Sequence, residues 1–146
     1  MTMHRRPVGR ARLLAALGAV VILVGCLLRW WAVGGDNGLP QLTGNGFDGF
    51  GILVFVVALA TIALVTLPYA TERPVGADRW PAYAILAATG WIALGIRVAD
   101  LLALRAFRFA QPTEVFTNGP GLWLAGIGLA MLARAAYDIF REPGHR

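Results

Sequence analysis

Three charged side chains lie inside stretches that are otherwise apolar. By residue type and spacing, they are the best candidates in the sequence for a binding or catalytic site. Arg29 lies near the end of the first apolar stretch, and Arg97 and Asp100 lie near the end of the third. Ionisable groups at membrane depth are costly, and they usually face a bundle interior, a water-filled cavity or one another. Because Arg97 and Asp100 are three residues apart, they share one face of a helix and can pair.

A helical rise of 1.5 Å per residue brings the three residues to one level. It places Arg29 about 25 Å along the first helix, and Arg97 and Asp100 about 24 to 28 Å along the third. Two interpretations stay open. In the first, Asp100 neutralises Arg97 or Arg29, and the cluster is structural. In the second, the excess of arginine forms an outward-facing pocket for an anion or a lipid headgroup.

Four apolar stretches must position these residues. They cover residues 13–33, 50–68, 82–104 and 120–137, and each has about the 20 residues that a bilayer span needs. Spans must be helices or closed barrels, and these runs are too long for barrel strands. The sequence therefore predicts one domain over residues 1–146, an all-α membrane protein with an antiparallel four-helix transmembrane bundle and short extracytoplasmic loops.

The distribution of arginine predicts the orientation of this bundle. All thirteen basic residues are arginine, and basic residues concentrate at the cytoplasmic ends of spans. One side of the predicted bundle carries nine, and the other carries Arg29, Arg97, Arg105 and Arg108. We therefore expect a multi-pass protein of the cytoplasmic membrane with both termini in the cytoplasm. Since the arginines lie at helix ends beside anionic headgroups, the expected partners are membrane lipids or another membrane protein, and not nucleic acid.

The first outer loop, residues 34–49, is rich in glycine and asparagine. Asn37-Gly38 and Asn45-Gly46 are turn signals, and residues 39–43 between them can form a strand of a small β-hairpin that lies on the membrane surface. Its acidic and amide side chains lack the spacing of a calcium loop. No metal site is expected.

The single cysteine, Cys26, excludes an intramolecular disulfide and any site built on paired cysteines. Residues 23–26, Leu-Val-Gly-Cys, resemble a bacterial lipobox, and cleavage before Cys26 with lipidation would leave three spans. The apolar and aromatic residues that follow favour the other alternative, an uncleaved span in which Cys26 is a small buried residue.

Small residues are expected to mark the contacts between helices, because lipid gives helices no hydrophobic drive to associate. On the fourth span, Arg134 is expected to pair with Asp138 one turn on, and Trp91 in the middle of the third span is expected to pack. The small-residue stripes are Ala15, Gly18 and Ala19 on the first span, Gly95, Ala99 and Ala103 on the third, and Gly121 with Ala125 and Gly126 with Ala130 on the fourth.

Enzyme classes find little support in the sequence. Both histidines, His4 and His145, lie in terminal tails, so no span carries a histidine base or ligand. No carboxylate pair has catalytic spacing, and no glycine-rich phosphate loop opens a helix. We expect a non-enzymatic small integral membrane protein without a cofactor, an accessory or structural component that acts through helix faces or outer loops. The alternative is a transport component that binds a small solute or a lipid at the Arg29, Arg97 and Asp100 cluster.

Three short runs carry a resemblance to a known group of proteins. They are Arg-Trp-Trp-Ala-Val-Gly at 29–34, Asn-Gly-Phe-Asp-Gly at 45–49 and Gly-Leu-Trp at 121–123. With these runs the chain resembles small four-span membrane proteins that are common in high-GC Gram-positive bacteria. The resemblance covers most of the chain and implies a four-span topology in a bacterial cytoplasmic membrane, without an activity.

Overall fold

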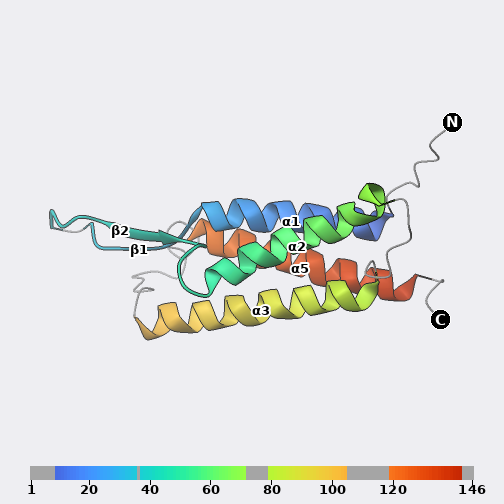
Figure 1. The fold of residues 1–146 in the computed structure, drawn as a ribbon. Helices are drawn as coiled ribbons and strands as arrows, with labels where there is room; N and C mark the ends of the chain where they lie inside the picture. Colours follow the sequence, from blue (N-terminus) through green and yellow to red (C-terminus); the bar gives the residue numbers. More distant parts are fainter. Residues whose placement is uncertain (1–8, 36, 72–78, 105–118, 143–146) are drawn as a thin grey trace.

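The structure, a computed structural model, describes residues 9–35, 37–71, 79–104 and 119–142. In chain order its elements are α1 (Arg10–Leu27), β1 (Arg29–Val33), β2 (Leu42–Asn45), α2 (Gly51–Ala70), α3 (Trp80–Ala103) and α5 (Pro120–Arg141). All four helices are long and apolar enough to cross a membrane. They lie side by side in an elongated bundle, with the hairpin at one end, the hairpin end, and the start of α1 and the end of α5 at the other, the termini end (Figure 1). The predicted set of four long helices with a small hairpin is confirmed.

Helices α1 and α5 pack most closely, and glycine makes this possible. A Cβ atom on Gly18 would lie 2.8 Å from the carbonyl oxygen of Gly128, and one on Gly25 would lie 2.8 Å from that of Gly121. In each helix the two glycines are seven residues apart, so both fall on the buried face, and the two backbones meet at two levels. The expected contact roles of Gly18 and Gly121 are confirmed.

The other helices complete the bundle: α2 packs against α1 and α3, and α3 packs against α5. The small-residue stripe predicted on α3 is not part of these contacts, because Gly95, Ala99 and Ala103 are exposed. The contact runs instead through Gly90, where the side chain of Leu129 fills the space that a Cβ atom would need. On α5, Ala130 of the predicted Gly126–Ala130 pair is also exposed. These two predictions were wrong, because the sequence does not say which helix face meets a neighbour.

Helix α1 ends at Leu27, and residues 29–33, which were predicted to continue it, form β1. Three donors satisfy the carbonyl groups of its last turn. The backbone N–H of Leu28 donates to Val24 at 3.2 Å, the N–H of Gly46 donates to Cys26 at 3.0 Å, and the Trp30 indole Nε1–H donates to Gly25 at 2.8 Å. The helix can therefore end inside the bundle without orphaned acceptors at these positions.

Strands β1 and β2 form an antiparallel pair that confirms the expected hairpin. The predicted strand at residues 39–43 overlaps β2 only at residues 42 and 43, and β1 lies in the stretch that was predicted to be helical. The register slips between Arg29 and Trp31, which makes Trp30 the bulged residue. Its side chain is wholly buried. The hairpin extends beyond the helices roughly along the long axis of the bundle (Figure 1). It therefore does not lie flat across the end of the bundle.

Three smaller predictions can be compared with the structure. The burial of Cys26 is confirmed, and cleavage before it would remove most of α1, the helix that packs along α5. The ion pair of Arg134 with Asp138 is confirmed at 3.1 Å. The packing role of Trp91 was wrong, because its side chain is 44% exposed and faces away from the bundle.

Candidate functional site

The three charged residues that the sequence placed at one level differ in secondary structure and in burial. Arg29 is the first residue of β1 and is exposed, opposite Asn45. Arg97 lies on the buried face of α3, and Asp100, one turn further on, is half-buried. Within the described residues, no hydrogen bond or ion pair joins any two of the three. Arg29 was expected to belong to the first helix, but α1 ends before it and Arg29 begins a strand.

Arg97 is the buried cation of this set, with 8% of its surface exposed. Its guanidinium group lies against Gly49, in the turn of residues 46–51 that leads from the hairpin into α2. A Cβ atom on Gly49 would lie 3.3 Å from Nη1 of Arg97, and Gly49 has a φ of 57°. Both the close approach and the left-handed backbone favour glycine at this position.

The guanidinium group has no partner in the part of the chain that the structure describes. Its Nε atom is buried without a hydrogen-bond acceptor, and Arg97 forms no ion pair there. A buried charge is normally paired or hydrogen-bonded, because desolvation is otherwise uncompensated. A buried polar atom without a partner therefore calls for a specific explanation, such as an ion.

Asp48, the acidic residue of the turn beside Arg97, is engaged in a hydrogen bond within that turn. The Asp48 carboxylate accepts a hydrogen bond from the backbone N–H of Asn45 at 3.1 Å. One oxygen of this carboxylate and the indole nitrogen of Trp31 both occupy space that a Cβ atom on Gly44 would need. That indole N–H is the second buried donor without an acceptor among the described residues. The two unpartnered donors flank the same turn.

The start of α2 adds positive potential beside Arg97. Gly49 directly precedes Phe50, the N-cap of α2, and this helix has no acidic residue in its first turn and no side-chain cap. The N-terminal end of a helix carries partial positive charge and attracts anions. An arginine fork matches the oxygens of a phosphate or a carboxylate. The first N–H groups of α2 already donate to the backbone carbonyls of Asp48, Gly49 and Phe50, so the arginine fork is the part of this arrangement that is suited to an oxyanion.

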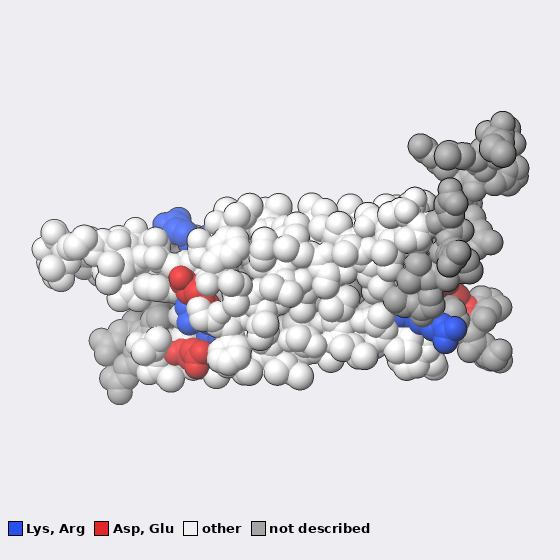
Figure 2. All heavy atoms as spheres, in the orientation of Figure 1, with Lys and Arg blue, Asp and Glu red and all other residues white. Residues whose placement is uncertain are grey.

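The charged side chains of the bundle gather at its two ends. Figure 2 shows red and blue atoms near the base of the hairpin and near the termini end, and a white surface along the middle of the visible face. This distribution is the one that the apolar stretches predict for helices that cross a membrane.

Sequence reasoning identified Arg97 and missed the residues around it. Gly49 and Trp31 belong to the two runs at 45–49 and 29–34 that carry the family resemblance, so their signal was present as a motif without a role.

Comparisons with protein-family models, with curated proteins and with solved structures find no match to this chain.

Proposed function

We propose that this chain is a non-enzymatic multi-pass protein of a bacterial cytoplasmic membrane that binds the oxyanion of a lipid headgroup or of a small solute at Arg97. The observation that carries the proposal is the buried side chain of Arg97, whose Nε atom has no hydrogen-bond acceptor among the described residues. The start of α2 beside it supports the same sign of ligand. Asp100 does not neutralise Arg97, which weakens the purely structural interpretation.

The orientation that we propose follows from the arginine asymmetry. With both termini in the cytoplasm, the hairpin end faces outward, and Arg97 lies at the outer edge of the hydrocarbon. A ligand would then be a phosphate or carboxylate of the outer leaflet, or a solute that arrives from outside. An accessory protein without a ligand is the competing role.

The substitution Arg97→Met separates these roles through the sign of its effect. Methionine keeps an unbranched apolar stem and removes the charge. In a non-ionic detergent free of added oxyanions, an unpaired buried charge destabilises the fold, so R97M is expected to melt at a higher temperature than the wild type. A ligand that binds only the folded wild type stabilises it by about 2.7 kcal/mol at 100 times its dissociation constant, which reverses the order.

The experiment has two arms that distinguish the sources of the oxyanion. In one, inorganic phosphate is added to protein in detergent; in the other, nanodiscs of phosphatidylglycerol are compared with nanodiscs of phosphatidylcholine. Arg29→Gln is the matched control, since Arg29 is exposed at the same end. A thermal shift in the wild type and in R29Q that is smaller in R97M supports the proposal. Equal shifts in all three proteins contradict it, and so does an R97M that is less stable than the wild type without any anion.

A further inference from the structure

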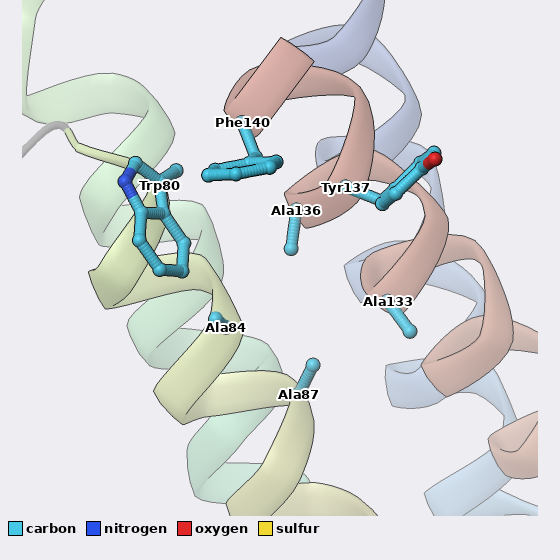
Figure 3. Close-up of a pocket in the computed structure, with 7 residues that line it drawn as sticks. All are labelled: Trp80, Ala84, Ala87, Ala133, Ala136, Tyr137 and Phe140. Atoms are coloured by element: carbon cyan, nitrogen blue, oxygen red, sulfur yellow. The ribbon is translucent and has the colours of Figure 1, made fainter. Parts of the chain in front are cut away.

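A groove between α3 and α5 lies at the termini end, away from Arg97. Its volume is about 360 Å³. The residues that line it are Trp80, Ala84 and Ala87 from α3, and Ala133, Ala136, Tyr137 and Phe140 from α5. Figure 3 shows the alanines of the two helices on opposite walls, with the rings of Trp80 and Phe140 close together at one end.

The shape of the groove follows from these side chains. The small alanines of the two walls leave the space between the helices open. At the end of the groove the rings of Trp80 and Phe140 meet edge to face, with centroids 5.0 Å apart, and bridge the two helices. Ala84 and Ala133 are half-buried, so the groove is accessible from the side of the bundle. The result is a short apolar slot closed at one end.

Two arginine side chains lie over the ring of Tyr137, one of the residues that line this slot. The guanidinium group of Arg141 lies 4.6 Å from the centre of the Tyr137 ring, and that of Arg134 lies 5.8 Å from it. Arg134 is neutralised by Asp138. Arg141 forms no ion pair with the described residues, and it is exposed. An apolar slot with an exposed cation beside one of its lining rings is complementary to a molecule with an apolar tail and an anionic head.

We propose that this groove binds an anionic phospholipid, with one acyl chain between the alanine walls and the phosphate at Arg141. Charge argues for this occupant, because Arg141 forms no ion pair with the described residues and an anionic headgroup would pair with it. Hydrocarbon chains and alanine walls are matched in polarity, and aromatic residues with arginine beside them are typical of the headgroup level. The proposal is independent of the Arg97 site, because it involves other residues at the opposite end of the bundle.

Native mass spectrometry of the full chain tests this proposal. The protein is equilibrated with equal amounts of phosphatidylglycerol and phosphatidylcholine, and the bound lipids are counted. Ala133→Leu fills the groove from α5, and Ala84→Leu fills it from α3 if the first variant does not fold. Ala130→Leu is the matched control, since Ala130 is an exposed alanine of the same helix outside the groove. Arg141→Gln removes the cation, with Arg10→Gln as its control at the same end.

The wild type, A130L and R10Q are expected to retain phosphatidylglycerol in preference to phosphatidylcholine. A133L and A84L are expected to bind at least tenfold less phosphatidylglycerol than the wild type. R141Q is expected to bind the two lipids equally. Retention by A133L at the level of A130L overturns the proposal. A wild type that binds both lipids equally also overturns it. So does a dimer that A133L converts to monomer without a change in bound lipid, because the groove would then hold a second copy of the chain.

Discussion

At the residue scale, the same amino acid has opposite meanings at neighbouring positions of one helix. A Cβ atom on Gly128 would lie 2.6 Å from the carbonyl oxygen of Gly18, whereas one on Gly126 would have only an ordinary contact, 3.9 Å from Leu94. The first glycine is required by the close approach of two backbones. The second glycine lowers the stability of the helix and makes no close contact between backbones. Sequence alone ranked these glycines the other way, since it singled out Gly126 and did not single out Gly128.

This difference predicts opposite effects for two alanine substitutions on α5. Gly128→Ala forces α1 and α5 apart, and overpacking of this kind costs about 1 to 3 kcal/mol. Gly126→Ala removes a poor helix former and is expected to leave stability unchanged or to raise it by up to about 1 kcal/mol. Thermal unfolding of both variants in the same detergent, followed by circular dichroism, measures the difference. Equal effects would mean that the two backbones are not in contact at Gly18.

At the element scale, the end of α1 shows where prediction from the sequence stops. The apolar run continues to residue 33, so hydropathy places the end of the span there. The helix ends at Leu27 because Gly46, far along the chain, and the bulged Trp30 supply donors to its last turn. Such acceptors and donors are tertiary contacts, which a local pattern does not contain. The lengths of α2, α3 and α5 depend on local apolar composition, and their predicted bounds were correct to within a few residues.

The role of Trp30 in ending α1 predicts a loss of stability in Trp30→Phe. Phenylalanine keeps an aromatic ring but removes the indole N–H, so the carbonyl of Gly25 loses its donor in a buried place. Leaving a buried group unsatisfied costs about 1 to 3 kcal/mol. Trp91→Phe is the control, because Trp91 is exposed on the bundle surface, and it is expected to be nearly neutral. If the two variants unfold at the same temperature, the hydrogen bond of Trp30 does not stabilise the end of the helix.

The candidate site was predictable in part for the same reason. A charged residue in an apolar stretch is visible in the sequence, and Arg97 was identified in this way. Its neighbours were not, since the turn at Gly49 reaches Arg97 only after α2 and α3 pack. The spacing allowed Asp100 to pair with Arg97, but residues three apart on a helix pair only if both side chains turn toward each other.

At the scale of the whole molecule, the apolar middle and the charged ends leave one property to be measured, the side of the membrane on which the hairpin lies. The chain has one cysteine, Cys26, and it is buried, so Cys26→Ala provides a background without reactive thiols. In that background Gln41→Cys places a thiol on the exposed hairpin, and Thr71→Cys places one just after α2, at the termini end.

Because nine arginines are expected to hold the termini end in the cytoplasm, a membrane-impermeant maleimide should label Q41C in intact cells and T71C only after permeabilisation. Labelling in the reverse order would contradict the proposed orientation, and with it the outward position of Arg97. Labelling of both residues in intact cells would mean that α2 does not cross the membrane.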